Sequence, residues 1–182
     1  MKKLILISGP SGSGKSTIID KILKDYPECK LSESISYTTR EMRPGEVNGQ
    51  HYHFVSDEKF DDMVCNDEFA EWANVYGKSY GTAIKDIESI LVGGNNAITA
   101  IDWQGARSIR KRLPVKTVFV CPPSMDILRD RLISRNPLDT TIDHRLAFAD
   151  SDMSHKDEYD LIVVNDNLDR VVAEIAEFIC ND

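Results

Sequence analysis

The chain has 182 residues, of which 41% are hydrophobic and 29% charged, with a formal net charge of −8. These values are typical of a globular protein large enough to bury a core in one domain, and they argue against disorder. The acidic balance argues against a general nucleic-acid or membrane-surface role, which would need a basic face.

The first predicted element is a buried strand over Leu4–Ile7, a short apolar run without polar alternation. The run is too short for the apolar core of a secretory signal. No stretch approaches the ~18 apolar residues that a membrane-spanning helix needs. We therefore expect a cytoplasmic protein without a membrane or nucleic-acid partner.

A glycine-rich motif follows this strand and precedes a helical pattern over Ser16–Lys24. Residues 9–16 match G-x-x-x-x-G-K-[ST], a pattern that a chain of this length would show by chance about one time in a hundred. Glycines let successive N–H groups face phosphates, and the helix adds its positive N-terminal end. Lys15 is placed to reach the β- and γ-phosphates and Ser16 to ligate Mg²⁺. The residues assigned to ATP here are Gly9, Pro10, Ser11, Gly12, Ser13, Gly14, Lys15, Ser16 and Thr17.

The next segment, from about Ser34 to Thr82, is polar, rich in turn residues and holds four of the six tyrosines. Such a composition is typical of an insertion that projects from a core. Within it, Ser56 is a candidate helix N-cap, with Asp57 and Glu58 in the following turn.

After residue 83, apolar runs alternate with helical stripes. The predicted strands are Ala97–Ile101, Val115–Cys121 and Leu161–Val164, and the helical stripes are Ile84/Ile87/Leu91, Met125/Leu128/Leu132 and Val171/Ile175/Phe178. Ser124 is a candidate N-cap. This alternation predicts an α/β fold with a parallel sheet flanked by helices, of the P-loop NTPase type.

The four cysteines, Cys29, Cys65, Cys121 and Cys180, are widely spaced and form no Cys-x-x-Cys. We expect reduced thiols rather than a zinc site or disulfides. His51 and His53 flank Tyr52 without an accompanying acidic or cysteine cluster, so we interpret them as surface residues rather than metal ligands.

Seven further segments accompany the P-loop: Ser36–Arg40, Arg43–Gly49, Tyr52–Ser56, Glu68–Ala73, Tyr80–Thr82, Ile101–Ala106 and Val163–Asp166. In this order and spacing, and with the P-loop before them, they resemble guanylate kinases along nearly the whole chain. The resemblance implies an enzyme that transfers the γ-phosphoryl group of Mg·ATP in line to GMP or dGMP in a closed site. It also implies a single domain, with a core (1–33, 83–128 and 153–182), a GMP-binding insertion (34–82) and a lid (129–152).

The resemblance assigns the acceptor site residue by residue. Arg40, Arg43, Tyr52 and Tyr80 are expected to grip the GMP phosphate, since guanidinium forks suit a dianion. Ser36, Glu71 and Thr82 are expected to contact guanine, and Glu71 would reject adenine, which offers its N1 lone pair instead of an N–H. Glu46 is expected to organise the loop.

The resemblance also assigns the catalytic groups and the lid. Asp102 is expected near Lys15, the water shell of Mg²⁺ and the acceptor, and Arg131, Arg135 and Arg145 are expected to neutralise the transferring phosphoryl group. Asn165 resembles a contact on the adenine side of ATP. Arg129 fits a solvated position on the helix surface better than Arg131 or Arg135 does.

Two positions depart from the family pattern. Many relatives carry a second acid two residues before Asp102, where this chain has Ala100. The usual Gly-Arg-Gly of the lid is replaced by Ser134-Arg135-Asn136-Pro137.

Two other functions compete with this interpretation. One is a catalytically inactive scaffold that binds phosphopeptides; such modules typically lack the P-loop lysine, which this chain keeps. The other is a kinase for a different nucleoside monophosphate, against which Glu71, Ser36 and Thr82 argue. The oligomeric state stays open.

Overall fold

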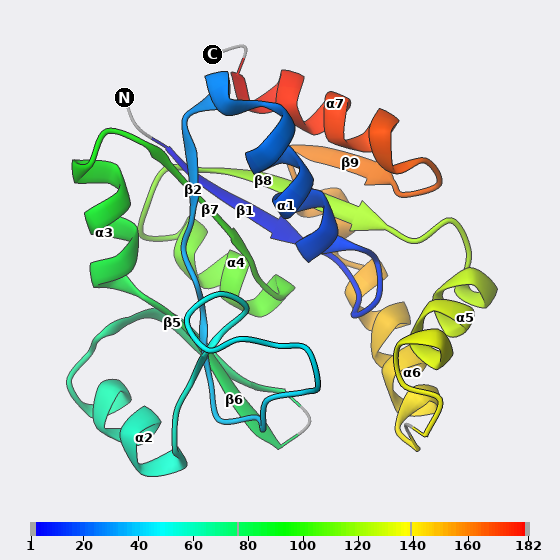
Figure 1. Cartoon of the computed structure of the whole chain (residues 1–182), viewed down its shortest axis with the longest axis horizontal. Coiled ribbons are helices and arrows are strands. Elements are labelled where there is room, and N and C mark those ends of the chain that lie inside the picture. The colour runs from blue at the N-terminus through cyan, green and yellow to red at the C-terminus, as the bar shows by residue number, and fades with distance from the viewer. Residues whose placement is uncertain (1–2, 76, 139, 181–182) are drawn as a thin grey trace.

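The computed structural model describes residues 3–75, 77–138 and 140–180 (Figure 1). Its central sheet has five parallel strands in the order β2-β7-β1-β8-β9. These are β2 (Leu31–Glu33), β7 (Asn96–Ala100), β1 (Leu4–Ser8), β8 (Val115–Cys121) and β9 (Leu161–Val164). The predicted parallel α/β fold is confirmed, and the four predicted strands differ from the observed ones by at most one residue at an end.

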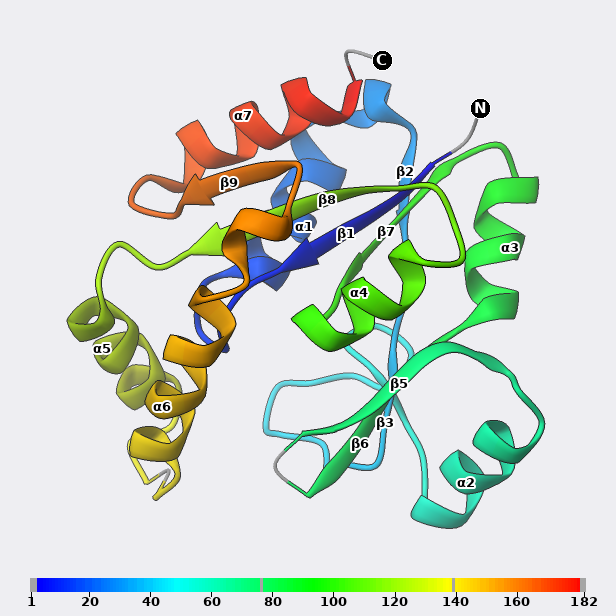
Figure 2. The same ribbon diagram turned by 180° about the vertical axis from the view of Figure 1, so that it is seen from behind.

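Helices cover both faces of this sheet, which explains why β1 shows no polar alternation. Ile5 and Ile7 point to one face, where they pack with α1 (Lys15–Asp25) and α7 (Leu168–Cys180). Leu4 and Leu6 point to the other, where they pack with α3 (Ile84–Val92) and α4 (Trp103–Arg110). Figures 1 and 2 show these two layers from opposite sides. Every side chain of the strand is therefore buried, as parallel sheets require.

A second sheet lies below the first in Figure 2 and has the strand order β4-β3-β6-β5. Its strands are β3 (Tyr37–Thr38), β4 (His53–Phe54), β5 (Phe69–Val75) and β6 (Lys78–Ala83), with α2 (Asp57–Cys65) packed against it. This sheet has its own small core, which contains Phe60, Met63, Phe69 and Ala83. Ser56 caps α2 as expected, its hydroxyl accepting from the Lys59 N–H at 3.2 Å.

Helices α5 (Met125–Arg135) and α6 (Ile142–Met153) pack side by side beyond the carboxyl ends of β1 and β8 (Figures 1 and 2). Leu128 and Leu132 of α5 meet Leu146 and Ala149 of α6 in a separate cluster. Ser124 caps α5 by accepting from the Ile127 N–H at 3.2 Å. This cluster is separate from the two clusters that cover the central sheet, so α5 and α6 are held together by a small core of their own.

One expectation about the cysteines is wrong. Cys29, in the short 3₁₀ helix η1 (Pro27–Cys29), forms a disulfide with Cys180 at the end of α7, with 5.3 Å between their Cα atoms. The two residues are 151 positions apart, so spacing gave no sign of the pair; packing of α1 and α7 on the same face of the sheet brings them together. Cys65 and Cys121 are free thiols.

No helix in the described part of the chain is both long and apolar enough to span a bilayer.

Candidate active site

The P-loop follows β1 and depends on three glycines with positive φ. Gly9, Gly12 and Gly14 have φ values of 140°, 90° and 101°. A Cβ at Gly9 would overlap the Val120 carbonyl of β8, and one at Gly14 would overlap the side-chain amide of Asn165. The loop therefore lies tight against β8 and the residue that follows β9, with a backbone path that L side chains rarely adopt.

Lys15, the first residue of α1, folds back over this loop. Its Nζ donates to the carbonyl oxygens of Gly9 at 2.6 Å and Pro10 at 3.0 Å. Burial lowers the pKa of Lys15 to about 8; Asp152 and Asp102 act against this shift and Arg135 adds to it. The ammonium group thus lies among charges from the core and from the helix pair α5–α6.

Two arginines of that helix pair contact the P-loop region directly. Arg131 donates from Nη2 to the Asn165 carbonyl at 2.9 Å and from Nη1 to the Ser13 carbonyl at 3.5 Å. Arg145 donates from Nη1 to the Ser11 hydroxyl at 3.3 Å. Arg129, by contrast, forms an exposed ion pair with Asp143 on α6 at 2.9 Å. Helices α5 and α6 therefore direct Arg131 and Arg145 toward the loop.

Asn165, directly after β9, is buried and supports the loop. Its Nδ2 donates to the Ser13 carbonyl at 2.7 Å, and its backbone N–H donates to the Cys121 carbonyl at 2.9 Å. This side-chain amide therefore holds the P-loop backbone.

A second basic cluster lies at the start of the smaller sheet. Arg40 forms a bidentate ion pair with Glu46, with distances of 2.8 and 2.9 Å, and its guanidinium lies 5.3 Å from the centre of the Tyr52 ring. Glu46 also accepts from the Arg43 backbone N–H at 2.8 Å, so it connects Arg40 and Arg43 within this loop. Tyr52 in turn packs edge-on against Tyr80, with ring centres 5.9 Å apart.

Positive charge accumulates around Arg43. Its pKa is lowered by burial and by the neighbouring charges of Arg135, Arg40 and Arg145, against the attraction of Glu46. The charge of Arg135 on α5 also acts to lower the pKa values of Lys15 and Tyr52. The basic cluster of the smaller sheet and the arginines of α5 and α6 are thus within electrostatic range of one another, and such repelling cations favour a bound anion.

A buried carboxylate lies on the inner side of the smaller sheet. Glu71 in β5 is 9% exposed and accepts at Oε1 from the Thr82 hydroxyl of β6 at 2.8 Å, because the two residues are cross-strand partners. Burial raises the pKa of Glu71 to about 7, with a further contribution from Asp102. Ser36, half-buried just before β3, joins the same sheet through its carbonyl, which accepts from His53 N–H.

Asp102 is the N-cap of α4, and its Oδ1 accepts from the Gly105 N–H at 2.7 Å. The strand β7 ends at Ala100, which packs on the α1 side of the sheet. As an N-cap, Asp102 is fixed at the carboxyl end of β7, within electrostatic range of both Lys15 and Glu71.

Sequence reasoning missed Asp152 near the end of α6. Burial raises its pKa to about 6, Lys15 acts against this shift and Asp102 adds to it. In the sequence it is one acid among several on an acidic helix, so no pattern distinguished it. Only the packing of α6 brings its carboxylate toward Lys15.

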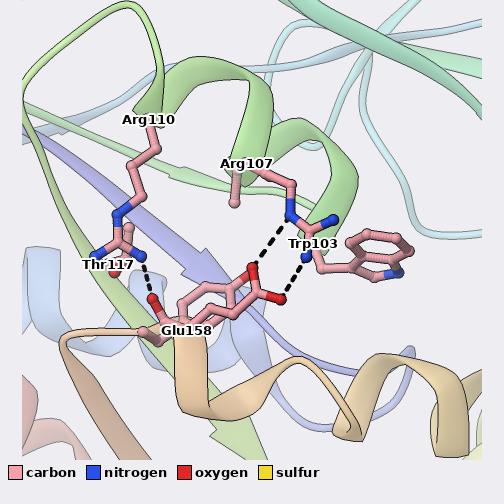
Figure 3. Close-up of a pocket in the computed structure, with 7 residues that line it drawn as sticks. Trp103, Arg107, Arg110, Thr117 and Glu158 are labelled. Carbon is pink, nitrogen blue, oxygen red and sulfur yellow. Dashed lines mark hydrogen bonds and ion pairs between the residues drawn. The ribbon is translucent and has the colours of Figure 1, made fainter.

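The chain after α6 is attached to α4, as Figure 3 shows for Arg107, Arg110 and Glu158. His155 stacks on Trp103 with ring centres 3.7 Å apart and bonds through Nδ1 to Glu158 at 2.9 Å. Glu158, in the 3₁₀ helix η2 (Lys156–Glu158), pairs with Arg107 at 2.5 Å. This attachment fixes the end of α6 beside Asp102, the N-cap of α4.

The two histidines beside Tyr52 have other partners. His51 accepts from the Val47 N–H at 3.0 Å, and the His53 ring packs against that of Tyr37, tilted by 30° with ring centres 4.5 Å apart. In the described ranges, no group of three or more His, Cys, Asp or Glu side chains is arranged to hold a metal ion.

A parallel sheet whose first strand enters a glycine-rich loop and a helix, with basic side chains directed at that loop, defines a P-loop nucleotide-binding protein. The model of the guanylate kinase family matches residues 1–182, and the chain belongs to that family.

Individual relatives agree over nearly the whole chain. The guanylate kinases of Idiomarina loihiensis and Shewanella oneidensis are 43% and 46% identical over 178 residues, which cover 97% of this chain and 85% and 86% of those proteins. The crystal structure of guanylate kinase from Anaplasma phagocytophilum is 31% identical, with a TM-score of 0.81 over 98% of this chain and 84% of that one.

Proposed function

We propose that this protein is an enzyme that transfers the γ-phosphoryl group of ATP to GMP, giving ADP and GDP. One observation supports the proposal beyond family membership: Arg131 and Arg145 of α5 and α6 donate to the P-loop, and the charges of Arg135 and Arg145 also act on Arg43 in the smaller sheet. A kinase needs donor and acceptor phosphates side by side, since the reaction depends on positioning and charge neutralisation.

The donor phosphates would occupy the P-loop, with the backbone N–H groups of residues 11–14 and of the start of α1 facing them. Lys15, now bonded to two loop carbonyls, would exchange these acceptors for phosphate oxygens. Asn165 would meet the adenine side while it holds Ser13.

The same region fits Mg²⁺ bound together with a triphosphate. Ser16 is exposed in the first turn of α1, two residues after Gly14. Its hydroxyl is a hard oxygen ligand, and phosphates and water can supply the rest of the coordination that Mg²⁺ prefers. When bound, the ion neutralises charge on the phosphate oxygens.

The acceptor phosphate would bind to Arg40, Arg43, Tyr52 and Tyr80. Arg40 is fixed by Glu46, so its guanidinium is pre-organised, and the tyrosine hydroxyls add neutral donors. The guanine base would lie against Ser36, Thr82 and the Glu71 carboxylate, which accepts from guanine N1–H and N2–H. Adenine would place its N1 lone pair there, and a buried unpaired charge disfavours it.

In the transfer step, a GMP phosphate oxygen would attack the γ-phosphorus in line, without a covalent intermediate. Arg131, Arg135 and Arg145 would neutralise the equatorial oxygens, and Asp102 would face the acceptor beside Lys15. Residues 34–82 would act as the GMP-binding segment and residues 129–152 as a lid whose closure excludes water.

A coupled assay of ADP formation with GMP, dGMP, AMP, UMP and CMP tests this function. We expect turnover with GMP, loss of nearly all of it in Lys15→Ala, and an unchanged melting temperature in that variant because Lys15 is not a core residue. Turnover only with another nucleotide, or none in the folded wild type, would overturn the proposal and favour a non-catalytic module.

A further inference from the structure

Gly105 is the third residue of α4 and contacts the two acids assigned above to the base and the acceptor. Its backbone N–H donates to Asp102 Oδ1 at 2.7 Å. On its other side, a Cβ would lie 2.5 Å from Oε2 of Glu71 and 2.8 Å from its Cδ. Real Cβ atoms essentially never come within 3.0 Å of a neighbour, so Glu71 occupies the space that any other side chain would fill.

This glycine is not required by the local backbone. Gly105 lies inside a regular helical segment and is not among the glycines with positive φ. Glycine weakens a helix relative to alanine, so its presence in the first turn needs another reason. The close approach of Glu71 supplies that reason.

The contact joins the two halves of the proposed site. Glu71 belongs to β5 of the smaller sheet, whereas Asp102 and Gly105 belong to the start of α4, which packs on the central sheet. Around them Ala70 of β5 packs with Ala106 and Ile109 of α4 in one core cluster. The carboxylate of Glu71 is therefore held from two directions, with Oε1 bonded to Thr82 and Oε2 resting on the first turn of α4.

We propose that Gly105 is a positioning residue that determines guanine specificity, because its missing side chain lets the Glu71 carboxylate rest on α4 in the plane needed to read guanine. This inference rests on the proposed function, in which Glu71 meets the base. The positive N-terminal end of α4 also favours a carboxylate at this place.

The expected displacement is large enough to matter. Ordinary contact with a Cβ begins at about 3.4 Å, so alanine at position 105 would push Oε2 away by about 1 Å. A shift of about 1 Å in a group that must meet two N–H donors of one base can cost up to about a hundredfold in activity. Such a shift would weaken the binding of GMP and leave the binding of ATP at the P-loop unchanged.

The test compares Gly105→Ala with the control Gln104→Ala, which makes a helix-favouring change at the exposed neighbouring position. Glu71→Asp and the double variant complete a mutant cycle, since aspartate is one methylene shorter and leaves room for the new Cβ. For each protein we would measure kcat, the KM values for GMP and ATP, and the melting temperature. GMP binding can be followed by tryptophan fluorescence, because Trp72 and Trp103 are the neighbours in sequence of Glu71 and Asp102.

We expect Gly105→Ala to raise the KM and Kd for GMP about tenfold or more, with KM for ATP changed less than about twofold. Gln104→Ala should match the wild type. In the Glu71→Asp background the added methyl group should have a smaller effect, because the clash is relieved.

Three results would overturn the inference while the wild type remains an active GMP kinase. They are an unchanged KM for GMP, an equal loss for both substrates, or the same loss in both Glu71 backgrounds. Failure of both Gly105→Ala and the double variant to melt cooperatively would also overturn it, because Gly105 would then serve the packing of α4 on Ile101, whose Cδ1 would lie 2.8 Å from the Cβ. A wild type inactive with GMP would instead defeat the proposed function.

Discussion

The ionisation state of the Glu71 side chain decides which purine edge it complements. As a carboxylate it accepts twice, which fits guanine N1–H and N2–H. As a neutral acid it would donate one O–H and accept one N–H, which fits adenine N1 and N6. Glu71→Gln imitates the second pattern permanently, since an amide also offers one donor and one acceptor.

We therefore expect Glu71→Gln to lower kcat/KM for GMP by about a hundredfold and to raise the AMP/GMP ratio of kcat/KM. Steady-state assays with both nucleotides at fixed ATP measure this. GMP kinetics equal to those of the wild type would remove Glu71 from base recognition.

The pKa of Glu71, raised to about 7 by burial and by Asp102, predicts a pH dependence of GMP binding. Below pH 7 the carboxyl group is protonated in the free protein, so binding must release a proton and weakens as pH falls. Above pH 7 this dependence disappears. From pH 7 down to 6, GMP affinity should fall by up to about tenfold from this group.

Fluorescence titration with GMP from pH 5.5 to 8.5 measures this effect, and Glu71→Gln is the control because it retains the titration of the GMP phosphate itself. If the wild type and the variant showed the same slope, the ionisation of Glu71 would play no part in binding.

Arg135 is expected to act mainly in the reacting state, since its charge acts on both Lys15 and Arg43. Arg135→Ala should lower kcat about a hundredfold or more, with a smaller change in KM for ATP. Arg129→Ala, on the same helix but paired with Asp143, is the matched control and should stay near wild type. A raised KM for ATP with intact kcat would make Arg135 a ground-state contact.

Among the elements, the strand β7 ends at the position where many relatives carry a second acid and this chain has Ala100. Ala100 is the last residue of β7 and pairs with Ile7, directly before the P-loop. Residues two apart in an extended chain point the same way, so an acid at position 100 would lie on the side of Asp102. Like charges there repel unless a cation is present.

Ala100→Asp should therefore melt about 2–5 °C lower than wild type without Mg²⁺ and recover part of the loss when Mg²⁺ is added with an ATP analogue and GMP. Thermal melts across a Mg²⁺ titration compare the two proteins. Parallel shifts would show that position 100 does not sense the metal.

At the scale of the whole molecule, the Cys29–Cys180 bond links η1 to the end of α7, 151 residues later. Closing so large a loop restricts the unfolded chain, and such bonds typically contribute roughly 2–4 kcal/mol. Replacing both cysteines by serine should lower the urea midpoint accordingly and leave kcat unchanged, because η1 and the end of α7 lie at the end of α1 opposite the P-loop (Figure 1). Cys65→Ser, which removes a free thiol, is the control.

A thiol count under denaturing conditions checks the bond directly. Two reactive thiols are expected before reduction and four after it. Four thiols before reduction would contradict the bond, and a double-serine variant as stable as the wild type would remove its contribution to stability.

Local sequence patterns were enough to predict the parallel sheet, the P-loop and both serine caps, because these depend on residues close together in the chain. Apolar runs covered on both faces, glycines before a lysine, and a serine before a helical stripe carry their structure locally. The shared motifs also indicated the family. In contrast, the short edge strand β2 and the two-residue strands β3 and β4 have no such pattern and were not predicted.

Tertiary structure alone decided the contacts between distant segments. The Cys29–Cys180 bond, the approach of Asp152 to Lys15, and the contact of Glu71 with Gly105 join residues 151, 137 and 34 positions apart. Their residue types are ordinary for their own elements: a cysteine ending a helix, an acid on an acidic helix, a glycine in a first turn. Each gains its role from how helices and sheets pack, because burial and charge depend on neighbours in space that the local sequence does not specify.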